Sequence, residues 1–245
     1  LRRRSMELRQ RRNLETALRQ RDALAAACRN ALDPVRGRPA SLELDPCFEP
    51  PRYLVETHAH LLPGGYLSDF GPDDVAVGAA YEASSYSVVP GRSGPHSDGA
   101  GRALARWLLN RFPDFHPKRI LDLGCGAGLN TCAVARAFPD AEIIAIDAGA
   151  GLLRYAAARA AGLGVRNVRW VQADIERIKS HPAVERAEFS RAVRLQLDPQ
   201  RAQVTLIARP IDAANPGAML PLTSATAPWT QGMPPPIWIS EPMVD

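Results

Sequence analysis

The chain has 245 residues, of which 46% are hydrophobic and 23% charged, a balance that excludes a wholly disordered chain. No apolar run reaches the roughly 18 residues that a membrane span requires, so no membrane partner is expected. The net charge is +4, but residues 1–38 alone hold 11 Arg and 4 acidic residues and carry +7, while the remainder carries −3. A nucleic-acid partner is therefore not expected, and a phosphate-binding role for the basic segment is the alternative.

The four cysteines show no pairing pattern. They are Cys28, Cys47, Cys125 and Cys132, and they form neither a C-x-x-C motif nor the spacing of a disulfide framework. We therefore expect a reducing, cytoplasmic compartment. The N-terminal residues also lack the apolar segment of a secretory signal.

Residues 5–32 predict one long helix, because apolar residues recur near the 3.6-residue period. Asp33-Pro34 and Gly37 would end it. Together with a Pro-rich linker, this Arg-rich helix forms the first expected segment, residues 1–45. We expect the helix to pack on the core or on a second copy, which makes a homodimer through it one alternative.

Residues 46–115 are expected to form an N-terminal extension or cap. Pro72 and the acidic residues after it predict a short helix through Tyr81. Residues 98–112 predict a further helix, whose apolar face would hold Leu104, Trp107, Leu108 and Phe112. Tyr81 or Tyr86 is the candidate for a lid over a ligand. His58 and His60 lack a third metal ligand at the usual spacing, so no metal site is expected.

From residue 119 the pattern becomes β-α-β-α-β. The expected strands are 120–123, 143–147 and 168–171, and the expected helices are 128–138 and 150–161. This alternation predicts an α/β fold with a Rossmann-like, doubly wound, mainly parallel sheet. The helices upstream would form an N-terminal helical extension, and the sheet domain would cover residues 116–245.

The pattern weakens after residue 178. Residues 192–197 and 203–208 could form strands, but residues 213–240 contain no charged residue and residues 210–245 hold 8 of the 22 prolines. We therefore expect residues 178–245 to be diverged, frame-altered or truncated, with the C-terminal part of the sheet incomplete.

A glycine-rich loop follows the first strand of this pattern. Gly124, Gly126 and Gly128 lack the Cβ atoms that would block a ligand, and they tolerate unusual dihedral angles. Ligands of such sheets bind outside the carboxyl ends of the strands. A dinucleotide fingerprint would need glycine at position 129, where this chain has Leu129, and a P-loop would need a following Gly-Lys-Ser/Thr.

Three acidic residues accompany the ends of the three strands. Asp122 precedes the glycine loop, where a carboxylate repels a pyrophosphate but suits a cationic amine. Asp147 ends the second strand, the place at which an acidic residue accepts hydrogen bonds from ribose hydroxyls. Asp174 follows the third strand and can accept from an exocyclic amine. The pattern indicates a site for a cationic molecule that contains adenosine.

Residues 119–175 resemble the cofactor half of a class I S-adenosylmethionine-dependent methyltransferase. The run from Ile120 to Gly128, ILDLGCGAG, is similar to the family's first motif almost throughout. The resemblance implies that Asp122 and the glycine loop hold the methionine moiety, that Asp147 binds the ribose, and that Ala148 lies beside the adenine. It places Asp174 and the Ile175 backbone at the adenine amine. The predicted cofactor-binding residues are Asp122, Gly124, Cys125, Gly126, Gly128, Asp147, Ala148, Asp174 and Ile175.

The expected function is S-adenosylmethionine-dependent methyl transfer to an unidentified small molecule. The sequence names no general base, and no catalytic residue is assigned. Two alternatives remain: a non-catalytic or defective cofactor-binding protein, which the altered C-terminal segment favours, and an NAD-dependent oxidoreductase on a similar sheet.

Overall fold

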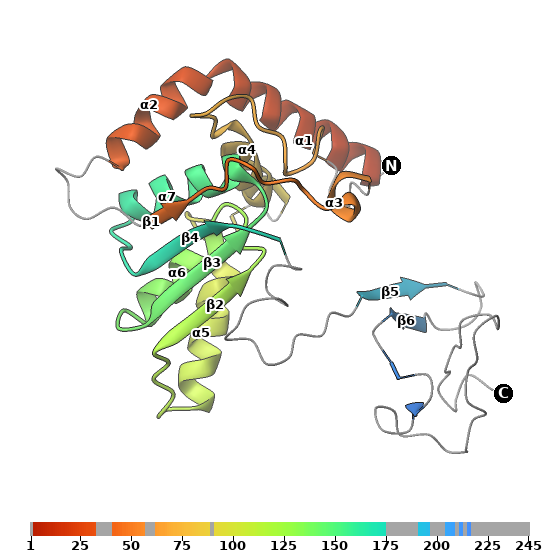
Figure 1. The fold of residues 1–245 in the computed structure, drawn as a ribbon, viewed down its shortest axis with the longest axis vertical. Helices are drawn as coiled ribbons and strands as arrows, with labels where there is room; N and C mark the ends of the chain where they lie inside the picture. Colours follow the sequence, from red (N-terminus) through yellow and green to blue (C-terminus); the bar gives the residue numbers. More distant parts are fainter. Residues whose placement is uncertain are drawn as a thin grey trace. The chain divides into compact units, whose positions relative to one another are not determined.

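The computed structural model describes residues 2–32, 41–56, 62–88, 91–174, 191–196, 204–208, 211–212 and 215–216. It divides into two compact units, Leu1–Ile178 and Lys179–Asp245 (Figure 1). Each unit is described by itself below.

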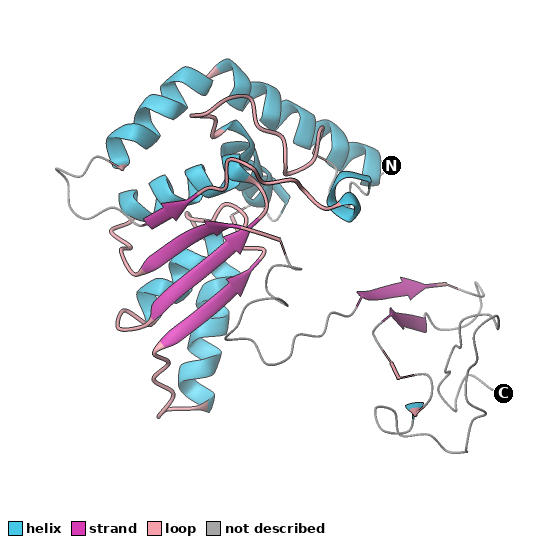
Figure 2. Cartoon of the chain, viewed as in Figure 1, coloured by secondary structure: helices cyan, strands magenta, loops and turns pink. Residues whose placement is uncertain are grey.

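The first unit is built on a parallel sheet with helices, which confirms the predicted α/β class. Its strands are β1 (Ser41–Glu43), β2 (Arg119–Leu123), β3 (Glu142–Asp147) and β4 (Val168–Gln172). Helix α6 (Leu129–Ala137) joins β2 to β3, and α7 (Ala150–Gly162) joins β3 to β4. The strand order is β1-β4-β3-β2, and every pair is parallel. Strands β2, β3 and β4 and helices α6 and α7 lie close to the residue ranges that the sequence predicts. The four strands form one sheet (Figure 2).

Strand β1 lies in the segment that the sequence predicts to be a Pro-rich linker after the first helix. Ser41, Leu42 and Glu43 pair with Arg169, Trp170 and Val171 of β4. The backbone N–H of Asp45 donates to Gln172 Oε1 at 3.2 Å, just beyond the strand. A three-residue strand has too few residues to show periodicity, and these contacts with β4 are what define it. The N-terminal segment therefore supplies one edge of the sheet.

The N-terminal helix is two helices rather than one. Helix α1 (Arg2–Arg19) ends before Gln20, whose backbone lies at φ −107° and ψ 10°, and α2 (Arg21–Ala31) follows it. Helix α1 packs on α4 (Ala76–Val88), whereas α2 packs on α7. Because α1 and α2 pack on different helices, the break at Gln20 allows each of them to orient a different set of side chains toward its partner. Leu14 and Ala17 of α1 are buried within the same chain.

The cap contains three more helices, α3 (Arg52–Glu56), α4 and α5 (Gly99–Arg111). The sequence predicts α4 too early, because residues 72–74 form the turn before the helix. Asp74 accepts a hydrogen bond from Ala76 N at 3.1 Å, at the first residue of α4.

Helix α5 is confirmed in position, but of its predicted apolar face only Leu108 packs on a core cluster. The buried residues of α5 are Gly101 and Ala105, while Leu104 and Trp107 are exposed. Gly101 allows a close approach to α6, since a Cβ there would lie 2.6 Å from the carbonyl oxygen of Asn130. The Asn130 side chain also accepts a hydrogen bond from Gly101 N at 2.9 Å. Small residues therefore form the contact with α6, whereas Leu104 and Trp107 face outward.

The main core lies on one face of the sheet. Ile143, Ala145, Val168 and Trp170 are buried there against residues of α6 and α7. Because side chains alternate along a strand, the residues between them point to the opposite face. That face carries Leu121, Leu123, Ile144, Ile146 and Val171, and we call it the open face. Leu121 is 48% exposed and Leu123 is 44% exposed.

The open face predicts an unequal response to substitution on the two sides of the sheet. Leu121→Ala removes three carbon atoms, yet we expect it to cost about 1 kcal/mol or less, because that side chain is half exposed already. Ile143→Val removes only one carbon but should cost about 1 kcal/mol in the close-packed core. Urea unfolding of both variants measures the comparison. A cost above about 2 kcal/mol for Leu121→Ala would show that the open face is covered in solution.

The second unit contains an antiparallel pair in its described residues, β5 (Arg191–Leu195) and β6 (Val204–Ala208). Both strands lie within one or two residues of the predicted positions. They form a separate two-stranded sheet. None of the helices in the described ranges is both long and apolar enough to cross a membrane.

Candidate functional site

The glycine loop connects β2 to α6 at the carboxyl end of the sheet. Gly124, Gly126 and Gly128 all have positive φ, at 75°, 55° and 70°. The N–H groups of Gly124 and Cys125 both donate to Ile146 O of β3, at 2.8 and 3.0 Å. These bonds fix the loop against the neighbouring strand, so its conformation is set before any ligand binds.

Gly128 is where the loop becomes a helix. It is the N-cap residue of α6 in the left-handed region. A Cβ at this position would lie 2.6 Å from Cη2 of Trp170 and 3.1 Å from the Cβ of Ala156. Backbone conformation and packing against β4 and α7 therefore both require glycine here.

Asp147 ties the end of β3 to the glycine loop. Its Oδ2 accepts from Gly126 N at 2.8 Å, and its Oδ1 accepts from Gly149 N at 2.9 Å. Burial raises the pKa of Asp147 above its ordinary value, and backbone hydrogen bonds from Gly149, Gly126 and Ala148 partly oppose that shift. Each carboxylate oxygen can accept a second hydrogen bond, so the residue can still accept from a ligand.

Asp122 is the second acidic residue at this edge. Thr131 Oγ1, in the first turn of α6, donates to Asp122 Oδ2 at 2.7 Å. Thr131 is buried and was not among the predicted residues. Its position three residues after the last glycine is the only signal that the sequence offers. The hydrogen bond orients the Asp122 carboxylate next to the loop.

The residues after β3 and β4 are partly described. Ala148 is half-buried, and its carbonyl oxygen accepts from Gln172 Nε2 at 3.0 Å. Gln172 was not predicted, although its side chain links β1, β4 and the residue after β3. Asp174 is half-buried. Ile175, like His58 and His60, lies outside the described residues.

The surroundings of Cys125 disfavour the thiolate form of its side chain. Burial raises the pKa of its thiol well above the usual value, and the negative charges of Asp147 and Asp122 raise it further. A thiol with a raised pKa stays protonated, whereas nucleophilic attack needs the thiolate. The place of Cys125 among the cofactor-binding residues stays a prediction.

A pair of tyrosines from the cap packs next to the loop through one of its members, Tyr81. Tyr81 of α4 and Tyr66 make an edge-to-face contact with ring centroids 5.2 Å apart. A Cβ on Gly126 would lie 3.6 Å from Tyr81 Cζ, so the Tyr81 ring borders the loop. Burial raises the pKa of Tyr66 to about 12, with Tyr81 and Asp147 adding to the shift. Both phenols are protonated at neutral pH. Tyr86, the other lid candidate, is 51% exposed.

Polar contacts hold α4 against α7 next to Tyr81. Glu82 Oε2 accepts from Tyr155 Oη at 2.7 Å and from Arg159 Nε at 3.1 Å. Only 7% of the Arg159 side chain is exposed. Gly78 permits the approach, since a Cβ there would lie 2.3 Å from Cβ of Tyr155. These contacts position the helix that carries Tyr81.

Glu82→Gln should therefore lower the free energy of unfolding by about 1–2 kcal/mol, because the charge that pairs with the Arg159 guanidinium is lost. Urea unfolding measures the change. Glu15→Gln is the matched control, since Glu15 is exposed on α1 and should change stability by less than about 0.5 kcal/mol. Equal effects in the two variants would contradict an anchoring role for Glu82.

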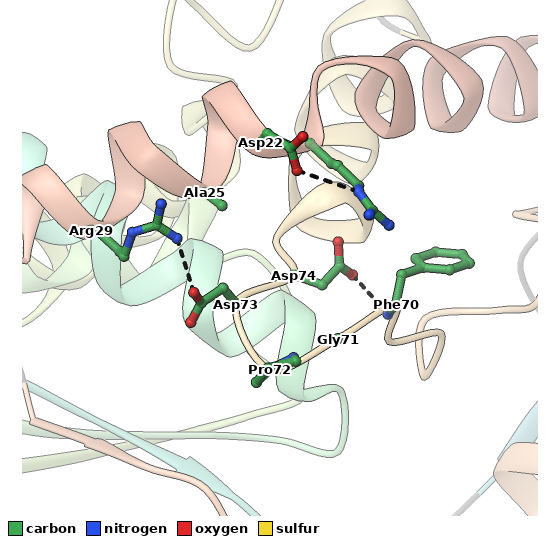
Figure 3. Close-up of a pocket in the computed structure, with 9 residues that line it drawn as sticks. Asp22, Ala25, Arg29, Phe70, Gly71, Pro72, Asp73 and Asp74 are labelled. Carbon is green, nitrogen blue, oxygen red and sulfur yellow. Dashed lines mark hydrogen bonds and ion pairs between the residues drawn. The ribbon is translucent and has the colours of Figure 1, made fainter.

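A separate hollow of about 370 Å³ lies between α2 and the turn before α4 (Figure 3). Its charged side chains already have partners: Arg29 pairs with Asp73 at 2.9 Å and Arg21 with Asp22 at 3.5 Å. Asp74 accepts from Phe70 N at 3.3 Å. No predicted site residue lines this hollow. Within the described ranges, no group of three or more metal-ligating side chains is found.

His96 and Asp98 precede α5 and have structural contacts. Asp98 is buried and pairs with Arg102 at 3.0 Å and with Arg136 at 2.5 Å. The His96 carbonyl oxygen accepts from Arg159. Asp98 thus joins α5 to α6.

Comparison with known proteins finds that residues 120–216 match the methyltransferase-domain family. An uncharacterized protein of Synechococcus sp. is 38% identical over 100 residues, which cover 38% of this chain and 24% of that protein. The trans-aconitate 2-methyltransferase of Methylobacterium nodulans is 34% identical over 113 residues, which cover 46% of this chain and 40% of that enzyme. The solved N-terminal domain of EvdMO1, with SAH bound, is 33% identical over 31% of each chain, with a TM-score of 0.28. The chain spans less than half the length of either relative.

Proposed function

We propose that the chain binds S-adenosylmethionine and transfers its methyl group to a small molecule, because residues 120–216 match the methyltransferase-domain family. The observation that carries this proposal is the fixed carboxylate of Asp147. Gly126 and Gly149 orient its two oxygens, and each oxygen retains capacity for a further bond from a vicinal diol such as that of ribose.

The glycine loop fits the methionine end of the cofactor. No atom lies within 4 Å of the point where a Cβ on Gly124 would be, so the loop leaves room for a ligand. The Asp122 carboxylate, oriented by Thr131, suits the ammonium group of the methionine moiety. Gly126 and Gly128 let the backbone approach without side-chain obstruction.

The adenine end would lie along the residues after β3 and β4. Ala148, fixed through its carbonyl by Gln172, would contact the ring. Asp174 and the Ile175 backbone would meet the exocyclic amine. These assignments follow the family resemblance at positions 147–148 and 174–175.

The cofactor, when bound, supplies a methyl group activated by a sulfonium. The ring of Tyr81 borders the loop, with Tyr66 packed against it, and both are uncharged at neutral pH, so their faces can stabilise a neighbouring positive charge. The chain's own contribution is alignment of cofactor and acceptor in a fixed site. No described residue is assigned as a general base.

An NAD-dependent enzyme is disfavoured by Leu129. This residue is 5% exposed and packs in the cluster beneath α4, where a dinucleotide fingerprint would place glycine. Only a measurement of turnover distinguishes an active methyltransferase from a non-catalytic cofactor-binding protein. Trans-aconitate, the substrate named for one relative, is the first acceptor to assay.

Titration calorimetry with S-adenosylmethionine, S-adenosylhomocysteine and NAD tests the proposal. We expect saturable binding of the first two and none of NAD. The absence of heat with both methionine-derived ligands would refute cofactor binding. Formation of S-adenosylhomocysteine in the presence of an acceptor would then establish catalysis, whereas binding without turnover on a broad panel of small-molecule acceptors would favour the non-catalytic alternative.

A further inference from the structure

A second hollow, of about 410 Å³, lies along the N-terminal half of α1. In the described part of the chain it is lined by Arg4, Ser5, Leu8, Arg9 and Arg12. We call it the α1 hollow. Its lining combines three guanidinium groups with one hydroxyl and one apolar side chain, and none of these residues is acidic.

The arginines of the α1 hollow differ from seven other arginines of the first unit, which are neutralised by carboxylates. Arginines of α2, α5, α6, α7 and β4 form ion pairs with carboxylates; they are Arg21, Arg29, Arg102, Arg136, Arg154, Arg159 and Arg169. Within the described ranges, no carboxylate lies within ion-pair distance of Arg4, Arg9 or Arg12. The hollow therefore concentrates positive charge that these residues do not neutralise.

The residues of the α1 hollow belong to a helix that packs on α4. Arg9 Nη1 donates to Ser87 O near the end of α4 at 2.9 Å, and Asn13 Nδ2 donates to Ser84 Oγ at 2.9 Å. The buried Leu14 lies two residues beyond Arg12. Because α1 is fixed in this way, the arginine side chains extend from a rigid base, which reduces the entropy lost when they bind a ligand.

The spacing of the arginines selects the kind of ligand. Arg4 and Arg12 are separated by eight residues, or about 12 Å along a helix axis, and Arg9 lies between them. Each side chain can reach several ångströms toward the others. Three donors spread over two turns match a ligand with more than one anionic group better than a single small ion. Guanidinium forks bind both carboxylates and phosphates.

We propose that the α1 hollow binds a small multivalent oxyanion, a compound with two or more carboxylate or phosphate groups. Arg4 and Arg12 hold its outer groups, and Leu8 contacts its carbon skeleton. A membrane surface is disfavoured because Leu8 is the single apolar residue in the described lining. A long nucleic acid is disfavoured because residues 39–245 carry a net charge of −3.

Calorimetry on the full chain at constant ionic strength tests this proposal, with citrate and inorganic pyrophosphate as the probes. We expect saturable one-site binding of at least one probe, and the stronger probe tells carboxylate from phosphate recognition. Arg4→Gln and Arg12→Gln should each weaken that binding at least fivefold. Arg11→Gln is the matched control, because Arg11 is exposed on the same helix and outside the hollow lining. Arg9 is left intact because it also anchors α1 to α4.

Three outcomes would overturn the proposal. One is the absence of saturable binding of either probe. Another is an equal loss in Arg11→Gln, which would indicate diffuse charge attraction. The third is displacement of the probes by a duplex oligonucleotide or by vesicles with anionic lipid, followed by tighter binding of that macromolecule. Circular dichroism of each variant confirms that the fold is retained, and binding of S-adenosylmethionine reports the cofactor site separately.

Discussion

Gly128→Ala is expected to lower the free energy of unfolding by about 2–4 kcal/mol, through backbone strain combined with overpacking. The residue has a φ of 70°, where a Cβ is unfavourable. A methyl group there would also meet the Trp170 ring at 2.6 Å. Trp170 is fully buried in the core against α6 and α7, so the ring has little room to move away. Urea unfolding measures the loss.

Substitutions at two further glycines distinguish the cost of backbone strain from the cost of overpacking. Gly162, the last residue of α7, has no positive φ and no atom within 4 Å of the point where a Cβ would be, so Gly162→Ala should be neutral or stabilising by up to about 1 kcal/mol. Gly124 has a φ of 75° but open space around it, so Gly124→Ala should cost about 1–2 kcal/mol from strain alone. A cost for Gly128→Ala no greater than that for Gly124→Ala would show that contact with Trp170 contributes nothing.

Asp147→Asn is expected to weaken binding of S-adenosylmethionine by about 10- to 100-fold, which corresponds to about 1–3 kcal/mol for a lost hydrogen-bond partner in a buried site. The amide group keeps the shape of the side chain, but its NH₂ group faces a backbone N–H that needs an acceptor. Calorimetry measures the affinity. Asp140→Asn, in the exposed turn before β3, is the control and should leave the affinity unchanged. Unaltered binding in Asp147→Asn would remove this residue from the cofactor site.

The raised pKa of Asp147 adds a pH signature to that experiment. Burial favours the protonated carboxyl group, so the ionised acceptor is lost at a higher pH than for an ordinary aspartate. Cofactor affinity should therefore fall as the pH drops through the raised pKa, and Asp147→Asn should abolish this dependence.

The contribution of Asp147 to folding stability depends on pH in the opposite direction from cofactor affinity. A raised pKa means that the folded state binds the proton more tightly than the unfolded state does. The stabilising contribution of Asp147 is fully present below the pKa that it has in the unfolded state. It is lost as the pH rises through the pKa that it has in the folded state.

The sequence predicts the part of the first unit from β2 to β4, because hydrophobic periodicity and turn residues indicate the same elements there. Strands β2, β3 and β4 are short apolar runs that end in acidic or turn residues, and the loop glycines are spaced for a strand-to-helix turn. The resulting prediction of the sheet is confirmed. The roles given to Asp122, Asp147 and Asp174 stay predictions, although the structure shows how the first two are held.

The features that the sequence does not reveal depend on distant contacts. Strand β1 exists through its pairing with β4, and the break at Gln20 arises because α1 and α2 meet different helices. The contact of α5 with α6 is defined by Gly101 rather than by large apolar residues. Thr131 and Gln172 are ordinary residues whose partners are known only once the chain has folded.

The pairing of β1 with β4 also bears on how the chain acquires its structure. Residues 41–43 are made early, but their partners at 169–171 follow more than a hundred residues later. Glu82 likewise forms its hydrogen bonds only after Tyr155 and Arg159 have been synthesised. Contacts so distant in sequence slow folding, because a long loop must close before they form. During synthesis on the ribosome, β1 is therefore the first strand of the sheet to emerge and must wait for the last strand before it can join.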